Sequence, residues 1–122
     1  MPYRSRRPNR RNSLKRLLLG VACTAIACGV LSPEEQLLTD FFEAARVYDT
    51  AVMARLSAVP MNPRADGIVD RFTIRTVDRS DTERERVTVS ANVRGFDGKS
   101  RARDLVFTVT HRDGRWFIQE WR

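Results

Sequence analysis

The chain has 122 residues, which is enough for one small domain and little more. Its formal net charge of +7 first suggests a nucleic acid or an acidic surface as a partner. The charge is unevenly placed, however, because residues 1–16 hold seven basic residues and no acidic one, whereas residues 17–122 hold fifteen of each sign. The part that folds is therefore neutral, which argues against a nucleic-acid partner.

The first 27 residues have the organisation of an export signal. An uncharged stretch follows the basic residues and runs from residue 17 to residue 33. A secretory signal has a basic start, an apolar segment of about 7–15 residues and small residues at its end. A permanent membrane-spanning helix usually needs about 20 apolar residues, and Gly20, Thr24 and Gly29 interrupt this one. The sequence predicts a signal peptide over residues 1–27, with an uncleaved signal anchor as the alternative.

Ala25–Cys28 resembles a bacterial lipobox, in which small residues precede a cysteine. The resemblance implies cleavage before Cys28 and attachment of a lipid to its thiol. Cys23 is a poorer candidate because too few apolar residues separate it from Arg16. We therefore expect a bacterial lipoprotein, exported and held at the membrane on the extracytoplasmic side of the cell envelope, with Cys28 as the lipidation site.

Arg10–Lys15 is similar to a twin-arginine export signal. Ser13 stands where that signal has a bulky apolar residue. The choice between general and twin-arginine export therefore stays open.

The single domain is expected over residues 28–122, with helical structure over 33–57. Ser32 can cap a helix, Pro33 fits the first helical position and Glu35 completes a capping box. Asp49 can cap a second helix, so the helical region is either one helix or two. An apolar stripe recurs at steps of three and four residues: Leu38, Phe41, Ala45, Tyr48, Val52 and Leu56.

Residues 58–67 are expected to form a loop, because Pro60 and Pro63 end helical structure. From residue 68 to residue 121 the apolar period changes to two, which is typical of strands joined by short polar turns. Each expected strand has a row of residues on one face: Phe72, Ile74 and Thr76; Val87, Val89, Ala91 and Val93; Leu105, Phe107 and Val109; Trp116 and Ile118.

These elements predict an α+β fold. An N-terminal helix, continuous or broken near Asp49, packs on one face of a four-stranded antiparallel sheet. The sheet is expected to be curved and cone-like.

Residues 34–122 resemble a small nuclear transport factor 2-like (cystatin-like) domain of exported bacterial proteins. The Phe41–Ala44 run, the break near Asp49 and the Asp113–Ile118 hairpin carry the resemblance. It implies a conical fold with a cavity between helices and sheet. Some relatives of this kind are isomerases or cyclases, and others have no known activity. No catalytic motif matches residue by residue, and fold does not imply function.

The sequence predicts no catalytic residue, no metal site and no cofactor. His111 is the only histidine, and both cysteines lie in the first 28 residues. No glycine-rich phosphate loop and no nucleophile elbow are present. If a cavity exists, Tyr48, Trp116 and Glu120 are the residues expected to line it, with Glu120 as a candidate general base. The alternative places both aromatic residues in the core and Glu120 at the rim.

We therefore expect a non-enzymatic binding or interaction domain tethered to the membrane. Its partner would be a protein, a second copy of the chain or a small apolar ligand. The exposed sheet face, with Val106, Thr108 and Phe117, is the expected interface. The alternatives are a small isomerase- or cyclase-type enzyme and an anchored subunit of an envelope transport or secretion complex.

Overall fold

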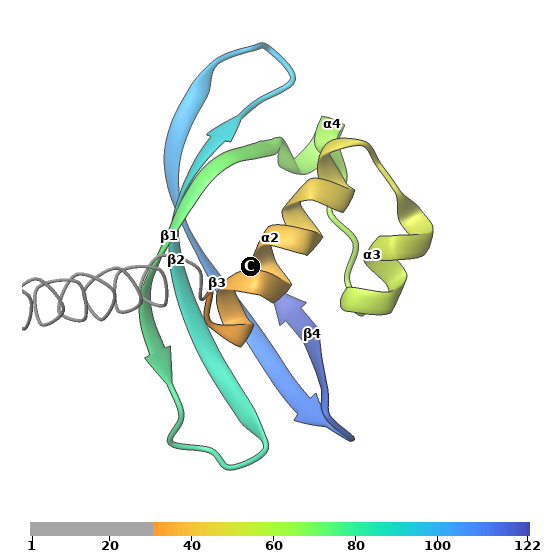
Figure 1. The fold of residues 1–122 in the computed structure, drawn as a ribbon. Coiled ribbons are helices and arrows are strands. Elements are labelled where there is room, and N and C mark those ends of the chain that lie inside the picture. Colours follow the sequence, from red (N-terminus) through yellow and green to blue (C-terminus); the bar gives the residue numbers. More distant parts are fainter. Residues whose placement is uncertain (1–30) are drawn as a thin grey trace, which may run out of the picture. The chain divides into compact units, whose positions relative to one another are not determined.

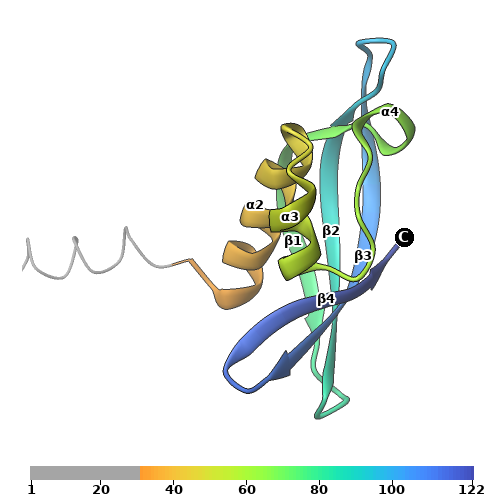
Figure 2. The ribbon, with the colours of Figure 1, turned by 90° about the vertical axis from the view of Figure 1, so that its right-hand side faces the viewer.

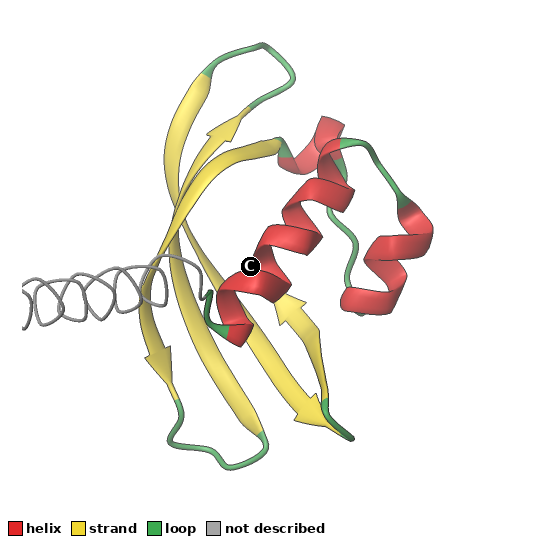
Figure 3. Ribbon diagram, in the orientation of Figure 1, coloured by secondary structure: helices red, strands yellow, loops and turns green. Residues whose placement is uncertain are grey.

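A computed structural model describes residues 31–122, so the predictions for the signal segment and for Cys28 lie outside the described residues. Residues 32–122 form a compact unit in which helices pack on one face of an open, four-stranded antiparallel sheet (Figures 1 and 3). This is the α+β fold class that the sequence predicts. The elements are α2 (Pro33–Arg46), α3 (Thr50–Leu56), α4 (Pro63–Asp66), β1 (Ile68–Asp78), β2 (Arg84–Arg94), β3 (Ser100–Arg112) and β4 (Arg115–Trp121).

Both predicted helix caps are present. The Ser32 hydroxyl accepts a hydrogen bond from the Glu35 backbone N–H at 3.2 Å. The Asp49 carboxylate accepts one from the Val52 backbone N–H at the same distance. Each cap satisfies a backbone donor that the first turn of a helix leaves free. The helical region is therefore two helices, α2 and α3.

The segment predicted as a loop contains a short helix, so that prediction is wrong in part. The Asn62 side chain accepts a hydrogen bond from the Arg64 backbone N–H at 2.9 Å and starts α4. Pro63 occupies the first helical position, where its missing N–H costs nothing. The loop prediction relied on Pro60 and Pro63 to end helical structure, whereas Pro63 also begins a new helix.

The four strands follow one another in sequence order, β1-β2-β3-β4, as three hairpins. The long strands curve around the helices (Figure 1). Two register shifts interrupt the β1–β2 pairing, one between Val69 and Arg71 and one between Ile74 and Thr76. Because a shift of one residue turns a side chain to the other face, Val77, and not Thr76, continues the inward row and packs on the core.

The core lies between α2 and the face of the sheet that it covers; we call this the inner face. Figure 2 shows α2 and α3 on the same side of the sheet. The largest completely buried side chains come from both layers and from the segment that joins them: Phe41, Phe107, Leu38, Met53, Met61, Ile118, Val87, Val89 and Val109. The inward rows of β2, β3 and β4 therefore match the predicted faces at these positions.

The free edge of β4 is partly covered. Ser57 forms a parallel bridge with Ile118, and the Ala58 N–H donates to the Ile118 carbonyl at 2.9 Å. The Trp121 indole N–H donates to the Val59 carbonyl at 3.1 Å. These contacts hold the chain after α3 against β4, and they fix the position of α3 beside the last hairpin.

Candidate functional site

The space between α2 and the sheet is filled by aromatic rings. The Phe42 ring centroid lies 5.7 Å from that of Phe107 and 5.1 Å from that of Phe72, both in edge-on contact. Phe41 packs edge-on against Phe107 at 6.3 Å, and Trp121 stacks on Phe107 at 6.4 Å. Edge-to-face and offset rings at such distances attract one another and exclude water. The aromatic residues here build the core.

Glu120 does not share a strand face with Trp116 and Ile118, as uninterrupted alternation along β4 would require. The β3–β4 register shifts between Thr108 and Val109, so that Glu120 pairs with Thr108 and Trp121 pairs with Phe107. The extra residue turns Trp121 into the core and Glu120 outward. Glu120 is exposed, and its carboxylate accepts a hydrogen bond from the Thr108 hydroxyl at 3.4 Å.

Tyr48 does not belong to the buried stripe of α2, contrary to the expectation. It follows the end of the helix with φ of 54°, and 50% of its surface is exposed. The Tyr48 N–H donates to the Ala45 carbonyl and the Asp49 N–H to the Ala44 carbonyl. This is the hydrogen-bond pattern of a helix ended by a left-handed residue. The tyrosine is the point where the chain turns from α2 to α3, so its side chain points away from the core.

Trp116 alone of the three expected cavity residues lines a large hollow. It is half-buried, and its ring stacks on His111 with a centroid distance of 4.4 Å. The hollow is a wide, open groove of about 960 Å³ between α2, α3 and the start of β4. We call it the helix groove. Its lining residues are Asp40, Glu43, Ala44, Arg46, Val47, Asp49, Val52, Arg55, Leu56, Arg115 and Trp116.

The helix groove combines an apolar strip with charges of both signs. Val47, Val52, Leu56 and Trp116 provide the apolar surface, and Val47 is 73% exposed. The charged residues of the lining are three carboxylates and three guanidinium groups: Asp40, Glu43, Asp49, Arg46, Arg55 and Arg115. The Arg115 guanidinium donates to the Arg55 carbonyl and ties β4 to α3. The lining thus mixes apolar and charged groups, as protein interfaces do.

A pair of acidic residues, Glu34 buried and Glu85 mostly buried, lies outside the helix groove and was missed by the sequence analysis. Glu34, at the start of α2, is 2% exposed, and Arg79 donates to it at 2.8 Å and to Glu85 at 3.1 Å. One carboxylate oxygen of Glu85 is buried and accepts no hydrogen bond. The signal in the sequence is that Glu85 occupies the inward row of β2, two residues before Val87.

The two carboxyl groups respond to this environment in opposite ways. Burial acts to raise the pKa of Glu34, but its own backbone N–H, the Glu85 carboxyl and Arg79 outweigh burial and hold the pKa below its usual value. Burial raises the pKa of Glu85, and the hydrogen bond and the charge of Glu34 raise it further. A proton on Glu85 gives that side chain a donor for Glu34. The pair and Arg79 hold the start of α2 against β2.

The described residues contain no group of three or more side chains suited to bind a metal ion. In the same part of the chain, none of the helices combines the length and the apolar character needed to cross a membrane. Comparisons of the chain with protein-family models, with curated proteins and with solved structures give no match.

Proposed function

We propose that this protein is a non-enzymatic interaction domain, held at the bacterial membrane by a lipid on Cys28, that binds a protein partner in the helix groove. The observation that carries the binding role is the groove itself, with its apolar and charged lining residues and an exposed Val47. A site for a small molecule usually encloses most of its ligand. A wide, open groove of about 960 Å³ suits a segment of another protein better.

The proposal favours binding over catalysis because the expected catalytic geometry is not assembled. Glu120 lies on the outer face of the sheet and Tyr48 at the end of α2, so neither lies beside Trp116 in the groove. The space between α2 and the sheet is occupied by Phe41, Phe42 and Phe107. A small cavity enzyme of the isomerase or cyclase type would need a carboxylate facing its substrate in that space.

The finer fold assignment is also a proposal. We propose that the domain is a small, cone-like member of the nuclear transport factor 2-like group whose cavity has been filled by aromatic side chains. The helix α2 on an antiparallel sheet and the strand order support it.

The membrane tether is tested by the intact mass of the membrane-extracted protein and of its Cys28→Ala variant. A chain that starts at Cys28 and carries the mass of acyl groups, lost in the variant, is the expected result. A full-length chain without acyl mass would overturn the lipid tether. Residues 17–33 would then serve as an anchor, and a subunit of an envelope transport or secretion complex would become the better proposal.

The groove is tested by photo-crosslinking in intact cells. A photoreactive amino acid at Val52, inside the groove, is compared with one at Thr88 on the opposite face of the sheet. We expect a discrete adduct from position 52 only, and its loss when Arg115→Glu reverses a charge of the groove lining. Arg84→Glu, an equal charge change at an exposed strand end, should leave the adduct intact. Equal crosslinking from both positions would contradict the proposal.

A further inference from the structure

The inner face of β3 changes character along the strand. Leu105, Phe107 and Val109 are buried under the helices, whereas Arg101 and Arg103, in the same alternating row, are exposed. Their partners across the ladder, Val93 and Ala91, are buried. Alternation places the two arginines on the face that forms the core elsewhere. The inner face thus continues beyond its core and carries two cations there.

These arginines line a small hollow between the tip of the β2–β3 hairpin and α4. Its volume is about 160 Å³. Its lining includes one acidic residue, Asp66, and four basic residues: Arg64, Lys99, Arg101 and Arg103. The Asp66 carboxylate already accepts a hydrogen bond from the Asn62 backbone N–H at 2.8 Å, as part of the first turn of α4. We call this hollow the hairpin pocket.

The walls of the hairpin pocket are held by their own hydrogen bonds. The Gly95 N–H donates to the Lys99 carbonyl at 2.8 Å, and the Lys99 N–H donates to the Asp97 carboxylate at 3.0 Å. On the other side, Gly67 approaches β2 so closely that a Cβ atom there would lie 2.6 Å from Val93 Cγ1. The pocket is therefore formed by the fold before any ligand arrives.

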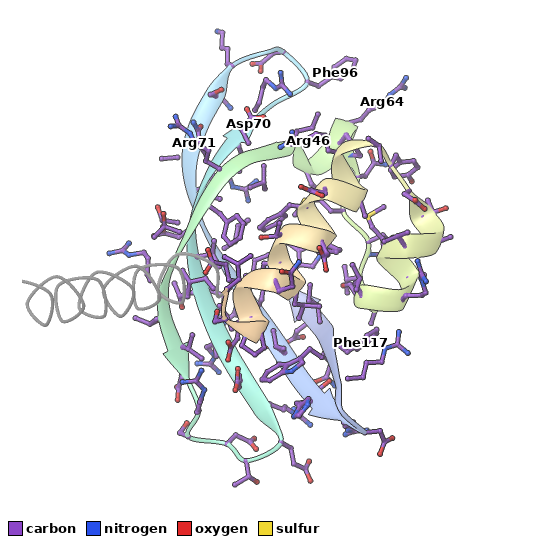
Figure 4. All side chains as sticks on the ribbon, viewed as in Figure 1. Arg46, Arg64, Asp70, Arg71, Phe96 and Phe117 are labelled. Carbon is purple, nitrogen blue, oxygen red and sulfur yellow. The ribbon has the colours of Figure 1, made fainter. Side chains whose placement is uncertain are left out.

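An exposed aromatic ring stands beside the hairpin pocket. Phe96 is 78% exposed, and the Arg64 guanidinium lies 5.7 Å from its ring centroid. Figure 4 shows the two side chains at the same end of the domain, one from the hairpin tip and one from α4. This cation–π contact places a guanidinium group and an apolar surface side by side.

The cations of the pocket are poorly neutralised by the protein. Arg101 reaches Asp97 at 3.7 Å, but both side chains are more than half exposed, so this pair contributes little to stability. Within the described residues, no ion pair involves Arg64, Lys99 or Arg103. All four cationic side chains are exposed and keep their water when no ligand is bound, so they are available to an anion.

We propose that the hairpin pocket binds the phosphate group of a ligand whose neighbouring apolar or ring portion contacts Phe96. Guanidinium groups bind phosphate oxygens through paired, charge-assisted hydrogen bonds. A hollow of about 160 Å³ has room for the phosphate but not for a whole ligand, so the rest of the molecule lies outside, where Phe96 stands.

The position of the pocket indicates which phosphate it takes. Glu34, in the first turn of α2, is bound through Arg79 to Glu85, at the beginning of β2. The hairpin pocket lies at the other end of β2, beyond Val93. Nine residues of strand between Glu85 and Arg94 span about 30 Å. The pocket therefore lies far along β2 from the start of α2, where the described unit begins, and Cys28, the proposed site of the tether, precedes that start in the chain. The phosphate in the pocket then comes from a soluble or polymeric envelope component and not from the anchoring membrane.

Binding is measured by equilibrium dialysis of inorganic phosphate against the full chain in detergent, with chloride at the same ionic strength as the reference. The pocket variant combines Arg101→Glu with Arg103→Glu. The matched control combines Arg84→Glu with Arg86→Glu, the same charge change on exposed positions near the opposite end of the sheet. All samples share the same residues before Leu31, so any contribution of that segment to binding cancels.

We expect saturable phosphate binding that weakens at least about tenfold in the pocket variant and stays unchanged in the control. Arg64→Ala, an exposed position on a different element, should weaken binding as well and guards against misfolding of the double variant. Equal loss in both double variants, or no saturable binding above chloride, would overturn the pocket.

A second arm separates the two sources of phosphate. Residues 32–122 of wild type and of the pocket variant, the compact unit without the leader and its proposed lipid, are floated with vesicles of phosphatidylcholine, alone or mixed with phosphatidylglycerol, after circular dichroism has shown that both are folded. Equal flotation of wild type and pocket variant is expected. A selective loss of flotation in the pocket variant, without binding of inorganic phosphate, would assign the pocket to a lipid headgroup and overturn the soluble source.

Discussion

Both ends of the inner face of the sheet carry charged residues, but those at one end are covered by protein and those at the other are exposed. At one end, Glu85 lies under the start of α2, where Glu34 and Arg79 enclose it. At the other end, Arg101 and Arg103 project from the same face into an open hollow. Both ends break the apolar rows of their strands with charged residues.

The difference is set by what covers each end. A charge under a helix must be paired or neutralised, because burial of an isolated charge is expensive. Glu85 meets this condition through Arg79 and through a raised pKa. A charge beyond the cover keeps its water and needs no partner. The acidic end therefore contributes to the fold, whereas the exposed cations of the basic end are those that we propose bind phosphate.

The largest expected effect tests the covered part between the two ends. Phe107→Ala removes a ring that contacts Phe41, Phe42 and Trp121, and a completely buried Phe usually contributes about 3–5 kcal/mol. We expect the free energy of unfolding to fall by about this amount, as measured by urea denaturation. A loss below about 1 kcal/mol would show that the rings are not packed as described.

The next effect tests whether the wall of the hairpin pocket is rigid. Gly67 has φ of 82°, and a Cβ atom there would meet Val93 Cγ1 and the Arg94 carbonyl oxygen at 2.6 and 2.9 Å. Gly67→Ala should cost about 1–3 kcal/mol from the backbone alone, with the contact in addition. Gly98→Ala is the matched control, because Gly98 has φ of 79° but open space around it. If both variants lower the melting temperature equally, the close contact at Gly67 makes no contribution to stability.

The third prediction concerns pH at the acidic end. A carboxyl whose pKa is raised by folding holds its proton more tightly in the folded state. Its contribution to the free energy of unfolding is therefore complete below the pKa of the unfolded state, and it is lost as pH rises through the pKa of the folded state. Glu85 is such a group, whereas Glu34, with its lowered pKa, contributes above the unfolded pKa and loses this contribution as pH falls through the folded one.

The contribution of Glu85 is isolated by Glu85→Gln, which keeps a hydrogen-bond donor for Glu34 and removes the titration of residue 85. Relative to wild type, its free energy of unfolding should increase as pH rises through the raised pKa of Glu85. Urea denaturation at a series of pH values measures the difference. Parallel pH profiles of the two proteins would contradict the raised pKa.

The smallest expected effect on stability is that of a substitution at the basic end. Arg103→Ala should change the free energy of unfolding by no more than about 0.5 kcal/mol, because the side chain is exposed and belongs to no ion pair within the described residues. Thermal unfolding monitored by circular dichroism measures it. A loss of more than about 1 kcal/mol would assign Arg103 to the fold and weaken its assignment to a ligand site.

Much of the fold could be predicted because its signals are local. The caps at Ser32 and Asp49 depend on residues within three positions of each other, and the β2 row from Val87 to Val93 alternates without interruption. The errors occurred where alternation was interrupted. The register shifts near Thr76 and Thr108 turned Val77 and Trp121 inward, and Glu120 outward. An extra residue in a strand leaves no mark in the residue types themselves.

The candidate sites were harder to predict than the fold. Of the three expected cavity residues, only Trp116 lines the helix groove, because Tyr48 became the left-handed residue at the end of α2. The hairpin pocket could not be predicted, because its basic residues come from three separate segments: α4, a turn and β3. In the sequence, these arginines are interspersed with acidic residues and resemble a solvated strand face.

The sequence by itself determined the two longer helices, the four strands, their order and their antiparallel neighbours, because capping, period and short turns act over a few residues. Only the tertiary structure decided which part of the inner face is covered. Coverage depends on the length of α2, on the curvature of the strands and on the turn at Tyr48, each of which acts between elements distant in the chain. The same row of β3 thus became core at Phe107 and an open cationic surface at Arg103.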